Sequence, residues 1–276
     1  MKKLLSALCG VALLSLSSCI GIDNWDAPDC TFHGTVYDSY TQQPLLASQG
    51  EWSIRIWEQS WTGNPDAVGA TNYQTIPIKQ DGTYKDTKLF SGTYDMHPYN
   101  GPFWVMDTLQ NVVLNKSTEQ NFTVIPFLQV VDFNYVVGTH NFGTVVTPVI
   151  KPALTLTCKL KAPLKEKNGV PLPNLRYVQA FLSRTFFCGY GSNGYISIAD
   201  YTSGSDGSRG RIDLNRSWAA EMQRQGLPAD SEISGEYTIG PLQVNSGYTY
   251  NIRVGASINT GGLGFNYSPI VQIKVP

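Results

Sequence analysis

The chain is poor in charge and has no basic face. Charged residues make up 15% of its 276 residues, the formal net charge is −1, and neither sign gathers into a block. Neutralising the phosphates of a nucleic acid requires clustered lysine and arginine, so a nucleic-acid partner is excluded. The apolar run of residues 4–16 is shorter than the roughly 20 residues that a membrane-spanning helix needs.

Motifs for catalysis and metal binding are missing as well. The three histidines, His33, His97 and His140, stand singly in strand-like runs without a second ligand at metal-binding spacing. The serines of glycine-rich runs lack the flanking glycines of a Gly-x-Ser-x-Gly elbow. Aspartates could pair as in a glycosidase, but most lie beside turn residues, where Asp caps the backbone. We therefore expect no catalytic residue, no metal site and no cofactor.

The N-terminus follows the pattern of an export signal. Lys2 and Lys3 precede the apolar residues 4–16, and Leu16-Ser17-Ser18-Cys19 resembles the bacterial lipobox. The resemblance implies that residues 1–18 are a lipoprotein signal peptide and that the thiol of Cys19 is lipidated. An ordinary leader with a stray cysteine and a membrane anchor are the alternatives.

Residues 19–29 read as a polar tether without strand or helix periodicity. Asp23, Asp26 and Asp29 keep this segment solvated. Acidic residues after a lipidated cysteine resemble the signals by which Bacteroidota lipoproteins reach the cell surface, although a plain polar linker would look the same. The expected location is the outer membrane, with the chain exposed on the cell surface.

The remaining three cysteines cannot form a complete disulfide framework, because their number is odd. Cys158 alternates with leucines on one face of a predicted strand, where a free thiol behaves as a small hydrophobe. An exported protein could still form one bridge, so a Cys158–Cys188 disulfide stays open.

The rest of the sequence has the pattern of short strands separated by turns. In residues 52–59, Ile54 and Ile56 share one face while Arg55 and Trp57 share the other. About seven such strands fill residues 30–128. Residues 126–130 pass into the second half without a Gly/Ser linker, which predicts a direct contact between the two halves.

The second half, residues 129–276, shows the same pattern of short strands and turns, together with one predicted helix. Asp213 or Asn215 is expected to cap a helix over residues 217–225, in which Trp218 is a packing anchor. The last two strands resemble those of fibronectin type III and immunoglobulin-like domains, with Tyr248 or Tyr250 as the tyrosine-corner residue. The expected fold is all-β, with two β-sandwich domains and one short helix.

The first half carries a family resemblance. Gly34–Asp38, Gln43–Leu45, Asp81–Tyr84 and Ser91–Tyr94 resemble the carboxypeptidase-regulatory, transthyretin-like β-sandwich. Residues 24–34 and 88–94 are similar to Bacteroidota outer-membrane lipoproteins of domain of unknown function 3823. The resemblance implies a setting beside SusC- and SusD-like glycan importers and possible partners among them.

Aromatic residues are the best candidates for ligand binding. Sugars present apolar C–H faces, which stack on exposed rings. We predict an oligosaccharide site in the first domain, with the rings in solvent, at Trp57, Trp61, Tyr99 and Trp104. The alternative is that these rings fill the sandwich ends or the seam between domains, because large aromatic rings are usually at least partly buried.

The favoured function is therefore a non-catalytic surface lipoprotein that serves a SusC/SusD-type glycan-import locus. A structural or adhesive subunit of fimbrillin type is the alternative. Asp107-Thr108-Leu109 also resembles the acceptor of Bacteroidota O-glycosylation, which makes Thr108 a candidate modification site, although a plain strand start fits the same residues.

Overall fold

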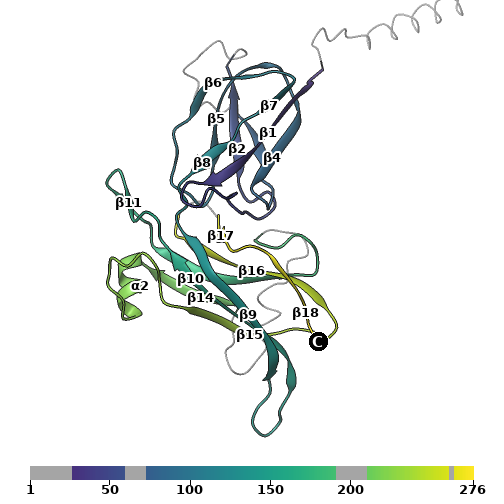
Figure 1. Cartoon of the computed structure of the whole chain (residues 1–276), viewed down its shortest axis with the longest axis vertical. Coiled ribbons are helices and arrows are strands. Elements are labelled where there is room, and N and C mark those ends of the chain that lie inside the picture. The colour runs from purple at the N-terminus through teal and green to yellow at the C-terminus, as the bar shows by residue number, and fades with distance from the viewer. Residues whose placement is uncertain (1–26, 60–72, 191–209, 261–263) are drawn as a thin grey trace, which may run out of the picture.

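The computed structural model describes residues 27–59, 73–190, 210–260 and 264–276. Its strands form two β-rich domains placed end to end along the long axis (Figure 1). The described residues contain one α-helix, and the predicted all-β, two-domain sandwich architecture is confirmed. None of the helices in these ranges is long and apolar enough to cross a membrane.

The first domain consists of two facing sheets with strand orders β4-β1-β7, where β8 also pairs with β1, and β3-β2-β5-β6. Its strands are β1 (Cys30–Asp38), β2 (Ser53–Glu58), β3 (Gln74–Pro77), β4 (Thr83–Leu89), β5 (Gly92–Tyr99), β6 (Leu109–Leu114), β7 (Ser117–Glu119) and β8 (Phe122–Val124). Every second residue of β1 is buried, because successive side chains alternate between core and solvent. Ile54 and Ile56 enter the same core from β2, as predicted.

The second domain is larger and holds the longest strands. Its elements are β9 (Gln129–Asn141), β10 (Ile150–Lys161), β11 (Glu166–Lys167), β12 (Val170–Pro171), β13 (Leu175–Ser183), β14 (Arg211–Arg216), α2 (Trp218–Arg224), β15 (Tyr237–Gln243), β16 (Thr249–Ile258), β17 (Asn266–Tyr267) and β18 (Val271–Lys274). The sheet β15-β10-β9 lies against β14-β13-β16-β17, in which β18 also pairs with β16.

The buried face of β10 confirms the alternation predicted for it. Leu154, Leu156, Cys158 and Leu160 are all fully buried in the second core. Cys30, Cys158 and Cys188 are free, so the bridge left open between Cys158 and Cys188 is not formed. Burial raises the pKa of the Cys158 thiol to about 12, which keeps it protonated and unreactive.

Helix α2 begins one residue later than expected and has a different N-cap. Ser217 is its N-cap, and the Ser217 hydroxyl accepts a hydrogen bond from the Ala220 N–H at 3.2 Å. Asp213 and Asn215, the predicted caps, belong instead to strand β14. Trp218 is buried and donates through Nε1 to the Ser231 carbonyl at 2.7 Å, which confirms its role as a packing anchor.

The tyrosine-corner position is occupied by Tyr250. Its ring is buried, and its hydroxyl accepts a hydrogen bond from the Asn245 N–H at 3.2 Å, back along the chain. Tyr248, the other candidate, is 44% exposed. The corner fixes the entry into β16, which pairs with β13 on one side and with β17 and β18 on the other.

Candidate functional site

The outer face of the β3-β2-β5-β6 sheet gathers aromatic and polar side chains from three neighbouring strands. Ile54 and Ile56 point into the core, so Arg55 and Trp57 between and after them point outward. The register completes the face: Arg55 lies opposite Thr75 and His97, Trp57 opposite Asp95, and Ser53 opposite Tyr99. We call Arg55, Trp57, Tyr73, His97 and Tyr99 the outer-face cluster.

Arg55 is the centre of this cluster. Its guanidinium carbon Cζ lies 3.3 Å from the centre of the Tyr99 ring and 3.8 Å from that of the Tyr73 ring. The two tyrosines come from strands or strand ends on opposite sides of β2, so the guanidinium lies between them. The Trp57 ring follows at 5.9 Å. Such cation–π contacts hold a long, flexible side chain in one place.

Arg55 has no acidic partner among the residues that the structure describes. Among the described residues it forms neither a hydrogen bond nor an ion pair, and its Nε is buried without an acceptor. Tyr73 beside it is 42% exposed, while Arg55 and Tyr99 are half-buried. The outer-face cluster therefore presents unused hydrogen-bond donors next to accessible ring surface.

His97 forms the polar side of the cluster. Its Nδ1 lies 2.9 Å from the Thr108 Oγ1, and its ring centre is 5.1 Å from that of Trp57. Burial and then the nearby Arg55 charge lower the pKa of His97, so the imidazole is neutral at pH 7. Asp95 is buried on the same face, where its Oδ1 accepts hydrogen bonds from the Gln59 amide at 2.6 Å and the Asn111 N–H at 2.9 Å.

The structure corrects two of the predicted platforms. Trp57 is on the predicted face, but its ring is 5% exposed, because His97 and Tyr73 close on it from the neighbouring strands. Trp104 is 6% exposed and packs on Phe127 at 5.2 Å within the core of the second domain. The expectation that these two rings lie in solvent is wrong, and Trp104 fills the seam between the domains.

The fold brings only some of the predicted site residues together. The outer face holds Trp57, Tyr99 and Thr108, the last through its contact with His97. Trp61 and Cys19 lie outside the described residues. Sequence reasoning placed Arg55 outward but did not make it, Tyr73 or His97 a site residue. Alternation alone could have found Arg55; Tyr73 and His97 needed the pairing of β2 with its neighbours.

A second arginine–tyrosine contact lies between the domains. Arg253 on β16 is fully buried, its Cζ lies 3.6 Å from the Tyr267 ring centre, and its Nη2 donates to the Ala47 carbonyl at 2.8 Å. Glu51 of the first domain accepts from the Tyr267 hydroxyl at 2.9 Å and from the Phe265 N–H at 3.2 Å. We call Glu51, Arg253 and Tyr267 the seam cluster. It shows the direct contact that the missing linker predicts.

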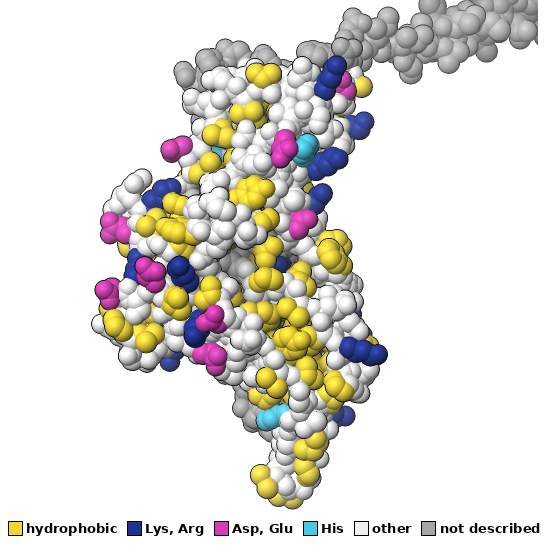
Figure 2. Space-filling model, in the orientation of Figure 1, with side chains coloured by type: hydrophobic (Ala, Val, Ile, Leu, Met, Phe, Trp, Pro, Cys, Tyr) yellow, Lys and Arg dark blue, Asp and Glu magenta, His cyan; other side chains and the backbone are white. Residues whose placement is uncertain are grey.

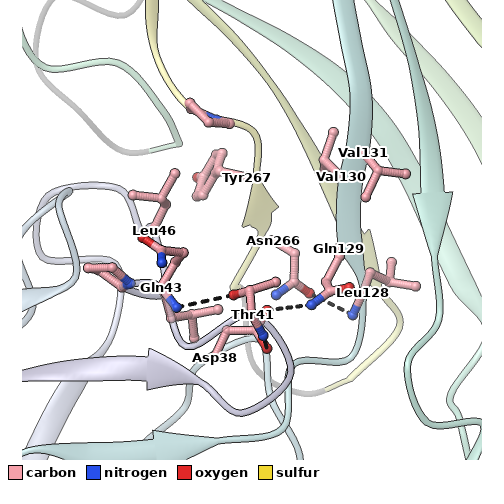
Figure 3. A pocket seen from close by; sticks show the side chains of 13 residues that line it. Asp38, Thr41, Gln43, Leu46, Leu128, Gln129, Val130, Val131, Asn266 and Tyr267 are labelled. Atoms are coloured by element: carbon pink, nitrogen blue, oxygen red, sulfur yellow. Dashed lines mark hydrogen bonds between the residues drawn. The ribbon is translucent and has the colours of Figure 1, made fainter.

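A pocket of about 210 Å³ opens beside the seam cluster (Figure 3). Three of its polar side chains already bind one another or the backbone: Asp38 accepts from the Gln129 amide at 2.5 Å, and Asn266 Oδ1 accepts from the Leu128 N–H at 3.1 Å. Most of the other lining residues are apolar: Pro44, Leu45, Leu46, Leu128, Val130, Val131, Tyr267 and Pro269. The residues around the pocket therefore join the domains, and the outer-face cluster is the better candidate for a ligand site.

No group of three His, Cys, Asp or Glu side chains within the described ranges could hold a metal ion.

Comparison with known proteins places the first domain. Residues 30–125 match the N-terminal domain of the protein family of unknown function DUF3823. This part of the chain is similar to DUF3823 N-terminal domains. The match spans strands β1 to β8, and every residue of the outer-face cluster lies within it. Among curated proteins, no sequence matches the chain.

Solved structures share the fold of both domains. A candidate carbohydrate-binding protein of Bacteroides uniformis ATCC 8492 is 21% identical, with a TM-score of 0.61 over 90% of this chain and all of its own. DUF3823 family proteins of the same organism and of Parabacteroides merdae ATCC 43184 are 20% and 19% identical, with TM-scores of 0.61 and 0.57 and the same coverage. At these identities the likeness shows the fold alone.

Proposed function

We propose that this chain is a lipid-anchored, non-catalytic surface protein that binds oligosaccharide on the outer face of its DUF3823 domain. The observation that carries the proposal is the guanidinium of Arg55, held between Tyr73 and Tyr99 with no acidic partner among the described residues. In the proposed setting, the protein captures glycan beside a SusC/SusD-type importer in the outer membrane.

The chemistry of the cluster suits a sugar. A pyranose offers apolar C–H groups to a ring and hydroxyls to donors and acceptors at its rim. Tyr73 supplies accessible ring surface, while Arg55 and the neutral His97 supply polar atoms. Trp57 is buried behind them and fixes the positions of Tyr73 and His97 instead of touching the ligand.

Two further points support the proposal. A carbohydrate-binding role is suggested for the B. uniformis protein of the same fold. A site with two tyrosine platforms and a few hydrogen bonds is expected to bind with a dissociation constant of about 0.1–1 mM. An N-terminal lipid would hold many copies on one surface, where multivalent glycans gain avidity.

The test is a glycan-array screen of the purified full-length protein. Tyr73→Ala combined with Tyr99→Ala should remove glycan retention and leave the melting temperature almost unchanged. Tyr135→Ala is the matched control, because Tyr135 is also 42% exposed but lies on β9 of the second domain. Equal loss in the control, or full retention in the double variant, would refute the outer-face site.

The anchor is tested at Cys19. Cys19→Ala is expected to give an uncleaved or soluble protein that no longer partitions into detergent. Full partitioning after leader cleavage would show that something other than a lipidated Cys19 holds the chain at the membrane. Protease shaving of intact cells then distinguishes display on the cell surface from a periplasmic orientation.

Thr108 remains our candidate for O-glycosylation. Its hydroxyl contacts His97 in the unmodified chain, so a glycan on Thr108 would sit at the rim of the proposed binding face. Intact-mass analysis of protein from the native host decides the matter: an unmodified Thr108 peptide at full occupancy excludes this modification.

A structural or adhesive role is the second candidate, and the β9–β10 arm, residues 133–150, favours it. The arm holds no Asp, Glu, Lys or Arg, and most of its valines are exposed, with Val145 at 97% and Val146 at 89%. Figure 2 shows hydrophobic side chains on the surface at the lower end of the molecule. Within the described residues, β9 is one of the two edge strands of its sheet. An uncharged apolar edge suits antiparallel pairing with β9 of a second copy.

Sedimentation velocity tests this second candidate. It predicts a dimer that Val136→Lys dissociates, because Val136 is 66% exposed on β9. Val113→Lys is the control, since Val113 is 65% exposed on β6 of the first domain. A monomer at high concentration would refute assembly through the arm.

A further inference from the structure

The outer-face cluster contains an arginine that no feature of a neutral-sugar site requires. Rings and amides are enough to bind uncharged glycans. Arg55 is the only arginine of residues 30–128, yet it occupies the centre of the cluster. A buried Nε without an acceptor is unfavourable and calls for an explanation.

In the described part of the chain, Arg55 forms no ion pair, and its half-buried side chain is not a fully solvated surface charge either. The nearest acidic side chain across the sheet, Asp95, is buried and engaged by Gln59 and Asn111. Tyr73 and Tyr99 cover the guanidinium from two strands, at 3.8 Å and 3.3 Å from Cζ. The faces of the group are therefore occupied, and what remains for a ligand is its edge.

The edge of a guanidinium matches one ligand chemistry best. Its N–H groups lie in one plane as a fork, which a planar carboxylate meets with two parallel hydrogen bonds. We propose that the outer-face cluster selects acidic oligosaccharides, with the carboxylate of a uronic acid residue bound edge-on to Arg55 and the sugar ring against Tyr73. This inference rests on the proposed function and names its ligand class.

The neighbours of Arg55 agree with an anionic ligand. His97, directly opposite on β5, is neutral at pH 7 and bonded through Nδ1 to Thr108, so it adds no repulsion and leaves its other nitrogen for a hydroxyl. The carboxylate of Asp95, which lies opposite Trp57 on the same face, is buried and turned away from the solvent.

The test is a direct binding titration of the full-length protein with matched pairs of oligosaccharides. Each pair consists of a uronic acid oligomer, built from galacturonate, glucuronate or mannuronate, and its uncharged methyl ester. Affinity for at least one acid should exceed that for its ester by about ten- to a hundredfold, the range given by charged hydrogen bonds. Arg55→Gln should remove this preference, and Arg55→Lys, which keeps the charge but loses the fork, should restore only part of it.

Arg184→Gln is the control for net charge. Arg184 is exposed and lies over the Tyr248 ring at 4.7 Å, so it is a second arginine stacked on a tyrosine, in the other domain. Equal weakening by Arg55→Gln and Arg184→Gln would refute a specific carboxylate site. Binding of acids and esters with equal affinity would refute the acidic preference but leave the proposed function intact. Failure to bind any oligosaccharide of the panel or the array would refute both.

Discussion

Arg55 and Arg253 both lie against tyrosine rings, and they differ in what surrounds them. Arg253 is fully buried between the domains, donates to the Ala47 carbonyl and shares Tyr267 with the carboxyl group of Glu51. Arg55 is half-buried on an outer sheet face, forms no ion pair within the described ranges and lies next to a tyrosine that is 42% exposed.

The same contact therefore serves two purposes. At the seam cluster, the Arg253 guanidinium contacts the Tyr267 ring and donates to the Ala47 carbonyl, which joins residues about two hundred positions apart in the sequence. At the outer-face cluster, the rings orient the guanidinium but leave its edge for solvent or ligand. Arg253 also has a buried Nε and Nη1 without an acceptor, so unused donors do not separate the two sites. The comparison teaches that neither cation–π packing nor an unused donor identifies a binding site; accessibility separates Arg55 from Arg253.

Replacing Trp104 should have the largest effect on the free energy of unfolding. Trp104→Ala should cost about 3–5 kcal/mol of unfolding free energy, because it leaves a cavity where the ring meets Phe127. Trp104→Phe should cost much less, since it keeps a ring and removes a buried Nε1 that lacks an acceptor. Urea unfolding measures both, and an alanine variant as stable as the wild type would show that the seam is not packed as described.

Glu51 makes the seam sensitive to pH. Burial raises the pKa of its carboxyl group from 4.5 to about 7, against the lowering effect of its hydrogen bonds and of Arg253. The folded chain thus holds a proton that the unfolded chain has lost, and stability should fall as the pH rises from about 4.5 to about 7. The total is on the order of 3 kcal/mol. Glu51→Gln should flatten this slope in unfolding titrations, and an unchanged slope would assign it to another group.

The two arginines can be compared directly as alanine variants. Arg253→Ala should lose about 2–3 kcal/mol, because it opens a cavity and leaves the Ala47 carbonyl without its donor. Arg55→Ala should lose less than about 1 kcal/mol, as a partly exposed side chain without hydrogen-bond partners in the described structure. The reverse order in thermal unfolding would overturn the division between seam and binding face.

The smallest expected effect on stability is that of His97, and it appears at acidic pH. Its pKa is lowered in the folded chain by burial and by Arg55, so the unfolded chain binds a proton more readily. Stability should therefore fall as the pH drops below about 6.5. His97→Gln should weaken this acid dependence slightly, and an NMR titration that placed the imidazole pKa above its ordinary value would contradict the account.

The sequence predicted which face of a strand each side chain occupies, but not which strands lie beside it. Alternation correctly set Ile54 inside and Trp57 outside, because side-chain direction depends only on the strand itself. The exposure of Trp57 depends on His97, forty residues later, which the pairing of β2 with β5 brings beside it. The burial of Trp104 likewise depends on Phe127 and on the second domain's core.

Local chemistry also explains the smaller differences. The cap of α2 is Ser217 and not Asp213 or Asn215, because Ser217 directly precedes the helix and has the required side chain. The seam cluster had no sequence pattern at all, since Glu51 and Tyr267 meet only after both domains have folded. The family resemblance, in contrast, could be read from short motifs, because they encode the turns and strands of one domain.

The most direct test of the central claim is a chemical-shift titration of the labelled full-length protein with a uronic acid oligosaccharide. The account predicts that the largest perturbations fall on the Arg55 Nε–H, the His97 imidazole and the rings of Tyr73 and Tyr99, while signals of Arg253 and of residues 128–131 stay in place. Perturbations centred on the interdomain pocket or on the β9–β10 arm, with the outer-face cluster unmoved, would contradict it.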